Sequence, residues 1–163
     1  MMPHRPISAL DKALRLLSAR AYSSGELNQR LIRAGYPQEE AAAAVEECRR
    51  HHYLDDRMFA EDCAEMWLER GHGALSIRQK LRQRGVSAEF AAEALNMSKE
   101  QETEAAYRAI ESKLPSLFRE KDHSKRQAKA LRFLVARGFS GDVLRDAMRY
   151  LDTAIKDREE QSD

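Results

Sequence analysis

The chain has 163 residues, of which 42% are hydrophobic and 34% charged, and its 28 basic and 27 acidic side chains leave a net charge of +1. This length suits one ordinary domain or several small ones, and the composition is typical of a soluble helical protein. The near-neutral charge does not by itself indicate nucleic acid binding. No apolar run approaches the roughly 20 residues of a membrane span, and the first residues carry no signal-peptide core. The two cysteines, Cys48 and Cys63, favour a reduced cytoplasmic protein over a disulfide scaffold.

One helix ending occurs three times along the chain. In each copy a leucine stands four residues before a glycine, a large apolar residue stands directly after it, and an alanine and a larger apolar residue stand nine and ten residues after it. The matched offsets predict an internal repeat of about 50 residues. The leucine, glycine and following residue of the three copies are Leu31, Gly35 and Tyr36; Leu81, Gly85 and Val86; and Leu134, Gly138 and Phe139.

These endings predict a tight corner between two helices. A glycine just past a helix adopts the left-handed conformation without a side-chain penalty, and the apolar residue after it folds back towards the leucine. Ser87 and Ser140 are then predicted to cap the next helix, and Pro37 fits an early helical position.

The first repeat is predicted to span residues 8–53. Ser8 caps its first helix, with Leu10, Ala13, Leu14 and Leu17 at helical spacing, and either Ser23 or Ser24 caps the second. The third helix, 38–52, has acidic residues in its first turn and basic residues in its last, which complements the helix dipole.

The second repeat is predicted to span residues 54–97. Asp55 or Asp56 caps its first helix, and Phe59, Cys63, Met66 and Trp67 form the apolar face of that helix. Gly71 and Gly73 end it. The second helix has either Leu75 or Ile77 inward together with Leu81, and the third covers 87–95.

The third repeat is predicted to span residues 98–152. Its first helix ends before Pro115, and an irregular connection covers 116–124. The next helix, to Arg137, has Leu131 and Leu134 inside, and Leu151 belongs to the inner face of the last one. Residues 153–163 form a polar tail, frayed from 156 onward.

These elements predict an all-α fold: three tandem three-helix repeats, resembling helix-turn-helix units, in an elongated and curved array. No stretch alternates like a strand for long. Because each repeat alone has a small core, neighbouring repeats are expected to stabilise each other.

Charge is sorted along the chain although its sum is near zero. Residues 38–69 carry ten acids and three bases, residues 70–84 carry five bases and no acid, and residues 119–137 carry seven bases and two acids. Both basic segments cover the middle helix of a repeat. They are either solvated helix faces or a surface for an anionic partner, and the repetition favours the second interpretation. The candidate contact residues are Arg70, Arg78, Arg82, Arg84, Lys125, Lys129 and Arg132, with Glu46, Glu47, Asp62 and Glu65 as an acidic contact.

Catalytic and metal-binding interpretations are weak. The sequence has no phosphate-binding loop and no dinucleotide fingerprint, and Asp55 and Asp56 fit a helix start better than a catalytic pair. Cys48 and His51 would need two more ligands for zinc, and Cys63 and His72 are the nearby candidates. We therefore expect no enzyme activity, no metal and no cofactor.

The stretch from Tyr53 to Ser87 resembles the central signature of the RecX regulatory proteins of bacteria. The matching residues are Tyr53, Leu54, Asp55, Asp56, Phe59, Ala60, Gly73, Ile77, Leu81, Gly85 and Val86. The resemblance extends from Ala9 to Leu151, through SSGEL near the start and FLVARGFS near the end.

This resemblance implies a function. RecX proteins consist of three three-helix repeats, bind the RecA recombinase and its filament on DNA, and mainly inhibit its ATPase, strand exchange and coprotease activities in recombination, DNA repair and the SOS response. Some also bind DNA. It implies a cytoplasmic bacterial protein that binds RecA, which we expect to be a monomer. The alternative is a tandem helix-turn-helix-like protein that binds DNA directly through phosphate contacts. Alanine-rich or acidic third helices argue against base readout. A helical scaffold with an unknown partner is the third hypothesis.

Overall fold

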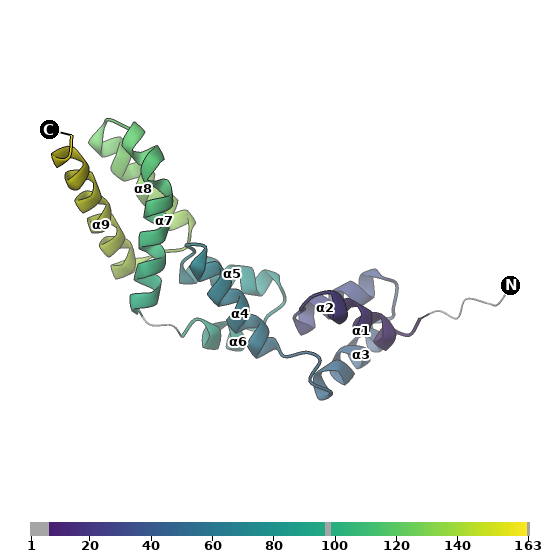
Figure 1. Ribbon diagram of the computed structural model, residues 1–163. Coiled ribbons are helices and arrows are strands. Elements are labelled where there is room, and N and C mark those ends of the chain that lie inside the picture. The colour runs from purple at the N-terminus through teal and green to yellow at the C-terminus, as the bar shows by residue number, and fades with distance from the viewer. Residues whose placement is uncertain (1–6, 97–98, 163) are drawn as a thin grey trace. The chain divides into compact units, whose positions relative to one another are not determined.

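The computed structural model describes residues 7–96 and 99–162, and within these ranges the chain is entirely helical apart from its turns and loops. Figure 1 shows the nine helices found there. They are α1 (Ala9–Ala19), α2 (Ser24–Arg33), α3 (Gln38–Arg50), α4 (Asp56–Glu69), α5 (Ala74–Gln83), α6 (Ala88–Ala94), α7 (Lys99–Arg119), α8 (His123–Ala136) and α9 (Gly141–Glu160). The predicted all-α fold of tandem three-helix repeats is confirmed.

The three predicted corners all form. Gly35, Gly85 and Gly138 have φ of 98°, 75° and 88°, the left-handed region that favours glycine. In each copy the residue after the glycine donates its backbone N–H to the carbonyl of the repeat leucine, which closes the helix end in a Schellman motif. Those N···O distances are 3.2 Å for Tyr36 to Leu31, 3.0 Å for Val86 to Leu81 and 3.2 Å for Phe139 to Leu134.

Most predicted helix caps are confirmed. The Ser8 hydroxyl accepts the Asp11 N–H, and Ser23 forms a reciprocal capping box with Glu26. The Ser87 hydroxyl accepts the Phe90 N–H at 3.2 Å. Ser140 stands at the N-cap position of α9 as predicted, but its side chain accepts no cap hydrogen bond. Gly141, the first residue of α9, follows with φ of 56°.

The two aspartates at the start of α4 have different hydrogen-bond partners. The Asp55 carboxylate accepts the Met58 N–H at 3.1 Å and therefore acts as the cap. Asp56 is the first helical residue, and its carboxylate accepts the Ser24 N–H at 2.7 Å.

Two predictions in the third repeat are wrong. Helix α7 continues through Pro115 to Arg119, so the irregular connection shrinks to residues 120–122. Proline inside a helix costs about 3 kcal/mol, but the fully buried Leu117 holds the following turn in the core. Helix α9 continues to Glu160 instead of fraying from 156, and in its last turns the Arg158 guanidinium lies 4.2 Å from the Phe118 ring centre.

The contacts among the described residues group them into two compact units. Unit 1 comprises the described residues up to Asp62 together with Leu81–Glu93, and unit 2 comprises Cys63–Lys80 together with the described residues from Ala94 onward. In unit 1, α1, α2 and α3 pack around a core that includes Leu27, Leu31 and Cys48.

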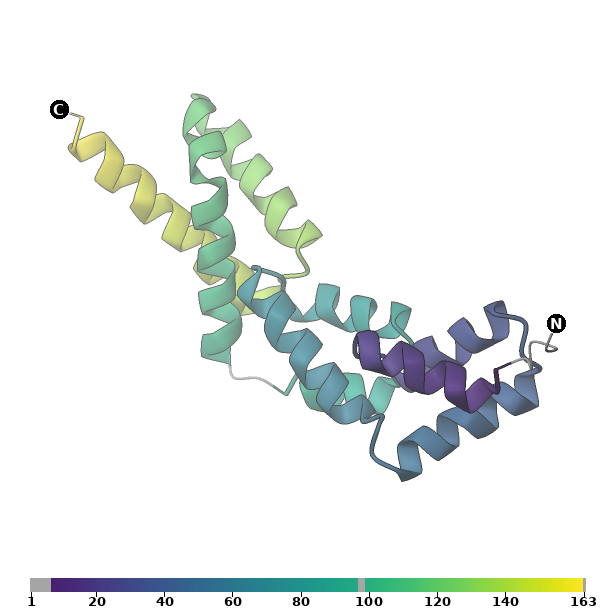
Figure 2. The same cartoon turned by 45° about the vertical axis from the view of Figure 1, so that its right-hand side comes forward.

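In unit 2, α7, α8 and α9 pack against one another, and α7 and α8 run side by side in both Figure 1 and Figure 2. Their core includes Ile110, Leu134, Phe139 and Leu151, each at most 1% exposed. Leu131, predicted to be inside, is 42% exposed because Ala130 and Leu134 occupy the core-facing positions of α8.

In the second repeat Ile77 is fully buried, whereas Leu75 is 54% exposed, so Ile77 is the residue of this pair that faces inward.

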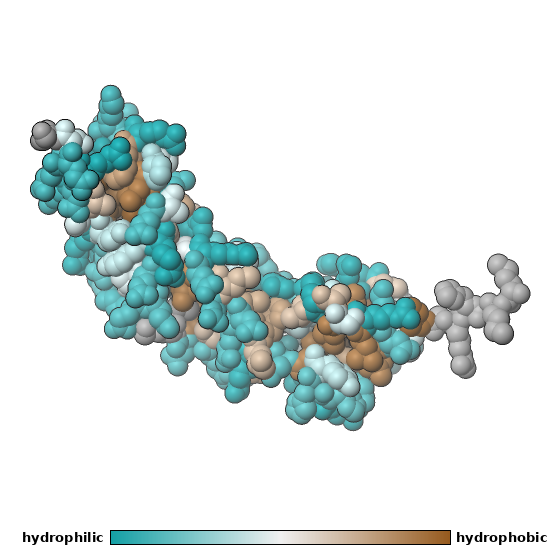
Figure 3. Space-filling view, in the orientation of Figure 1, coloured by the Kyte–Doolittle hydropathy of each residue, from teal (hydrophilic) through white to brown (hydrophobic). Residues whose placement is uncertain are grey.

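Figure 3 shows mainly hydrophilic side chains on the face in view, with hydrophobic patches among them.

Candidate functional site

Two glycines, Gly25 and Gly85, meet where the corner of the second repeat packs on the first turn of α2. We call this contact the first joint; it lies within unit 1 and comprises Ser23–Glu26 and Arg84–Val86. A Cβ atom at Gly25 would lie 2.6 Å from the Gly85 carbonyl oxygen and 2.8 Å from its Cα. No side chain fits there, so both positions require glycine.

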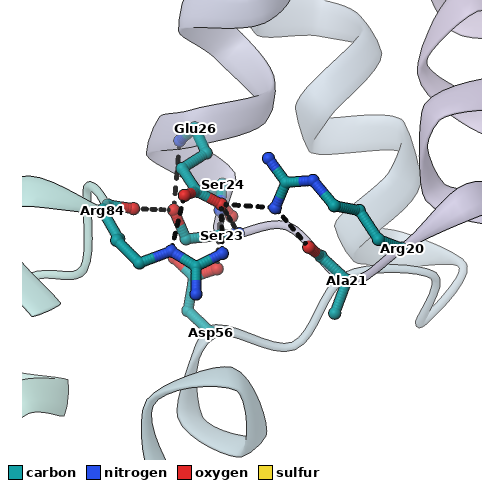
Figure 4. Close-up of polar contacts among 7 residues, drawn as sticks. All are labelled: Arg20, Ala21, Ser23, Ser24, Glu26, Asp56 and Arg84. Carbon is teal, nitrogen blue, oxygen red and sulfur yellow. Dashed lines mark hydrogen bonds and ion pairs between the residues drawn. The ribbon is translucent and has the colours of Figure 1, made fainter. Parts of the chain in front are cut away.

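Side chains complete the first joint (Figure 4). The Ser23 hydroxyl donates to the carbonyl oxygen of Arg84. The Glu26 carboxylate lies between two guanidinium groups: Arg84 Nε is 2.7 Å from its Oε1, and Arg20 Nη1 is 3.6 Å from its Oε2. Because Arg84 is held by Glu26 and also lies over the Phe59 ring at 4.7 Å, its side chain helps to hold the joint together.

A second joint, within unit 2, repeats the glycine contact with different polar groups. It comprises Gly73–Ser76 and Arg137–Phe139. A Cβ atom at Gly73 would lie 2.6 Å from the carbonyl carbon and oxygen of Gly138. Gly73 donates its N–H to the Arg137 carbonyl at 2.7 Å, and Leu75 donates to the Gly138 carbonyl at 3.3 Å. Main-chain groups therefore take the place that side chains have in the first joint.

Beside the second joint, Trp67 lies among cationic side chains. The Lys80 ammonium is 4.1 Å and the Arg70 guanidinium 5.3 Å from the Trp67 ring centre, both within cation–π range. His72 meets the same ring edge-on at 5.0 Å, and Arg137 Nη1 is 3.3 Å from His72 Nε2. We call these five residues the Trp67 cluster.

The electrostatics of this cluster keep His72 neutral over a wider pH range. Burial lowers the pKa of the His72 imidazole, and the nearby charges of Arg137, Lys80 and Arg70 lower it further. For Lys80, Arg70 and Arg137 no carboxylate partner is found among the described residues. The cluster therefore has uncompensated positive charge.

The other predicted basic residues lie on helical surfaces. Arg78 on α5 is exposed. On α8, Lys125 and Arg132 are exposed, whereas Lys129 is half-buried with its Nζ 3.4 Å from the Ser116 carbonyl. Their spacing of four and three residues places these three side chains along one strip of α8.

The first joint also has a hollow on its surface, which we call the arginine depression. Its volume is about 470 Å³. Arg82 and Arg84, both predicted contact residues, line it together with three arginines of the first repeat. The described residues that line it are Arg20, Tyr22, Gly25, Glu26, Gln29, Arg30, Arg33, Arg82, Gln83, Arg84 and Gly85.

The predicted acidic residues divide into two kinds. Glu46 pairs with Arg49 at 3.3 Å, and Glu47 pairs with Arg50 and with His51 on the same helix. The hydrogen bond with His51 is the largest effect that lowers the pKa of the Glu47 carboxyl. Asp62 and Glu65 are exposed on α4, and among the residues the structure covers neither forms an ion pair.

Sequence reasoning missed Arg20, Arg30 and Arg33 at the depression, and Lys80 and Arg137 beside Trp67. A signal existed for Arg30 and Arg33, because they lie on the second helix of the first repeat. That is the place where the basic segments occur in the other two repeats. Lys80 and Arg137 belong to those basic segments, but only the fold places them next to Trp67.

The residues considered for metal or nucleophile chemistry lie in other surroundings. Cys48 is fully buried, and burial raises the pKa of its thiol. His72 Nδ1 is 3.2 Å from the Ser76 hydroxyl. Within residues 7–96 and 99–162, no group of three or more His, Cys, Asp or Glu side chains could hold a metal ion. In the same ranges no helix has the length and apolar character needed to cross a membrane.

The helical corners and their joints define an all-α protein of tandem three-helix repeats, and comparisons with known proteins give the family. Family models for the first, second and third three-helix domains of RecX match residues 9–48, 55–95 and 100–148. The chain is 34% identical to Regulatory protein RecX of Vibrio parahaemolyticus, over 90% of this chain and 93% of that protein. It is 35% identical to Regulatory protein RecX of Chlorobaculum tepidum, over 96% of both. The chain belongs to the RecX family.

Solved structures agree on the fold. The crystal structure of RecX from Lactobacillus salivarius superposes with a TM-score of 0.78 at 19% identity, covering 89% of this chain and 95% of that one. A second crystal structure, of regulatory protein RecX, gives a TM-score of 0.74 at 23% identity and covers 83% of this chain and 67% of that one.

Proposed function

We propose that this protein binds the RecA recombinase and its filament on DNA and mainly inhibits RecA ATP hydrolysis, strand exchange and coprotease activity. The observation that carries the proposal is the match of three successive RecX domain models along the chain, at the residues that form the repeat corners. The relatives named Regulatory protein RecX support it, because they align over nearly their whole length.

The contact surface that we propose consists of basic side chains on the second and third repeats. Arg78, Lys125 and Arg132 are exposed, and none of them has an ion pair in the part of the chain that the structure describes. Arg70 adds a cation beside Trp67, and Arg82 adds one at the arginine depression. Arg84 contributes indirectly, by holding the first joint together, since its guanidinium is already bound to Glu26. On α4, Asp62 and Glu65 are the better acidic candidates, because Glu46 and Glu47 are paired locally.

The test is RecA ATP hydrolysis on single-stranded DNA, with this protein added below the RecA concentration. We expect hydrolysis to fall, while binding to the same DNA without RecA stays weak. Unchanged hydrolysis would overturn the proposal.

Charge reversal locates the contact surface. Arg78→Glu with Arg132→Glu should raise the concentration needed for half-inhibition about tenfold, because two attractive charges become repulsive. Arg15→Glu on α1 is the matched control, because Arg15 is also exposed and outside both basic segments. If the control weakens inhibition equally, net charge rather than this surface is responsible.

Direct DNA binding is the second candidate function, and the Trp67 cluster favours it. Its three cations have no carboxylate partner among the described residues, and uncompensated positive charge attracts the phosphates of nucleic acids. Tight, steeply salt-dependent binding to bare DNA that is lost in Arg70→Gln with Lys80→Gln would establish it.

Further properties belong to the same proposal. We propose a cytoplasmic bacterial monomer that takes part in recombination, DNA repair and the SOS response, without catalysis or cofactor. We also propose that the repeats extend over residues 8–53, 54–97 and 98–152, with a polar segment from 153 onward.

A further inference from the structure

We propose that the arginine depression of the first joint binds a short acidic peptide segment of a protein partner through its carboxylates. The proposal rests on the proposed function for the expectation that the partner is a protein. Its test uses neither RecA nor a filament, so the two proposals can fail separately.

The charges that line the depression are unequal. Of the described residues, five arginines and one acid, Glu26, line it. The Glu26 carboxylate is bound to Arg84 at 2.7 Å and to Arg20 at 3.6 Å. Arg30, Arg33 and Arg82 form no ion pair in the part of the chain that the structure describes. Three guanidinium groups are therefore available to anions at one hollow.

These three guanidinium groups come from two helices that the joint holds together. Arg30 and Arg33 stand three residues apart on α2, so their side chains share one face of that helix. Arg82 comes from the end of α5. The Gly25–Gly85 contact and the Ser23 hydrogen bond to the Arg84 carbonyl fix the two segments against each other. Because the cations are held together before any ligand arrives, a ligand pays less of the ordering cost that weakens flexible sites.

The chemistry of the lining favours carboxylates. A guanidinium group is planar and presents a fork of donors that matches a carboxylate or a phosphate with two parallel hydrogen bonds. The side-chain amides of Gln29 and Gln83 add further donors at the same hollow. A volume of about 470 Å³ has room for a few side chains at once.

A nucleic acid fits the depression less well. Single strands are bound by cations combined with aromatic faces on which the bases stack. Here Tyr22 is 8% exposed, with the Arg20 guanidinium 3.7 Å above its ring centre. Phe59, at 6% exposed, is covered by Arg84 in the same way. Neither ring offers an open face, so the hollow provides charge without a stacking surface.

The experiment uses the full chain and a fluorescein-labelled hexaglutamate peptide, with binding followed by fluorescence anisotropy. We expect saturable binding that weakens with salt, because the contacts are between charges. Arg30→Gln combined with Arg33→Gln should weaken binding about tenfold or more, as expected for the loss of one or two charge-assisted hydrogen bonds. Circular dichroism of the variant checks that its helices remain.

Arg15→Gln is the matched control, since Arg15 lies in the same unit on α1 and does not line the depression. Affinity that falls equally in the control would overturn the proposal, as would the absence of saturable binding in the unchanged protein. A single-stranded oligonucleotide of matched charge is the competitor. If it binds more tightly than the peptide and loses affinity in the double variant, the depression is a nucleic acid site instead.

A comparison with RecA inhibition separates the two proposals. If the unchanged protein binds the peptide but does not inhibit RecA, only the proposed function is contradicted. Intact inhibition with no peptide binding would contradict this inference alone.

Discussion

The two joints achieve the same packing with different polar groups. In both, a corner glycine lies against a glycine near the start of a second helix: Gly85 on Gly25, and Gly138 on Gly73. Around this contact the first joint relies on the side chains of Ser23, Glu26 and Arg84, whereas the second relies on backbone N–H groups. Glycine is therefore the shared geometric requirement, and the surrounding charges are free to differ.

The consequence is that side-chain chemistry affects the joints unequally. The first joint depends on the Glu26 carboxylate, so its stability should respond to salt and to substitution of one acid. The second joint should respond mainly to changes at its glycines. The four predictions below test this difference, from the largest expected effect to the smallest.

Alanine at a joint glycine should be the most damaging change. Gly85→Ala and Gly138→Ala each place a Cβ against the facing segment and also oppose a positive φ. We expect each to lower the free energy of unfolding by about 2–4 kcal/mol, combining overpacking with the left-handed penalty. Urea titration followed by circular dichroism measures the loss.

Gly35→Ala is the matched control for this prediction. Its φ of 98° also requires glycine, but among the described residues nothing lies within 4 Å of an added Cβ. We expect a loss of only about 1 kcal/mol. Equal losses at Gly35 and Gly85 would mean that the glycine contact contributes little.

Removing one carboxylate that contacts each joint, Glu26 at the first and Glu102 of α7 at the second, should reveal the difference in polar groups. Glu26→Ala removes the capping box and leaves Arg84 without its acid, so we expect a loss of about 1–3 kcal/mol. Glu102→Ala removes one acceptor, for the Ala74 N–H at 3.0 Å, and should cost about 0.5–1.5 kcal/mol. Urea titrations at low and high salt measure both, and only the Glu26 effect should shrink at high salt.

A lower pH should weaken the Trp67 cluster beside the second joint through His72. Burial and the charges of Arg137, Lys80 and Arg70 lower its pKa in the folded state. The unfolded chain therefore binds the proton more readily, so this contribution to stability is present above the ordinary histidine pKa and is lost as pH falls towards the folded-state value. Unfolding measured between neutral and mildly acidic pH should show a smaller pH dependence in His72→Gln. His123→Gln, at the exposed start of α8, is the control and should leave the pH dependence in place.

The smallest effect is expected at the Trp67 cluster. Lys80→Met keeps the length of the side chain and removes the charge 4.1 Å from the ring centre. The loss in unfolding free energy should be about 0.5–1 kcal/mol. Trp67 is the only tryptophan in the chain, so a change in tryptophan emission should accompany this substitution. Emission that stays unchanged would argue that Lys80 does not sit over the ring in solution.

The sequence was sufficient to predict the corners because they are local. Glycine, the leucine four residues earlier and the apolar residue after it determine the Schellman ending without help from distant parts of the chain. Proline in α7 was misinterpreted for the same reason. Its local preference ends a helix, and only the burial of Leu117 in a core built by other helices overrides that preference.

The sites were less predictable, because they depend on which segments meet. Arg82 and Arg84 were identified from a basic run, but the run does not show that Glu26 binds Arg84 while Arg82 has no ion pair among the described residues. Nor does it show that Arg30 and Arg33, far away in sequence, line the same hollow. Charge in a sequence indicates the type of surface, and the fold determines which of those charges remain uncompensated.

The open corner at Gly35 makes the chain extensible by protein engineering. The equivalent corners at Gly85 and Gly138 each carry the segment of a preceding repeat, whereas at Gly35 the space is free among the described residues. A fourth repeat could be fused ahead of the first, with a Ser-Ser-Gly-Glu segment copied from residues 23–26. The glycine of that segment would then pack on Gly35 as Gly25 packs on Gly85. The Gly35 corner could therefore be used to join further three-helix repeats and so to build longer arrays.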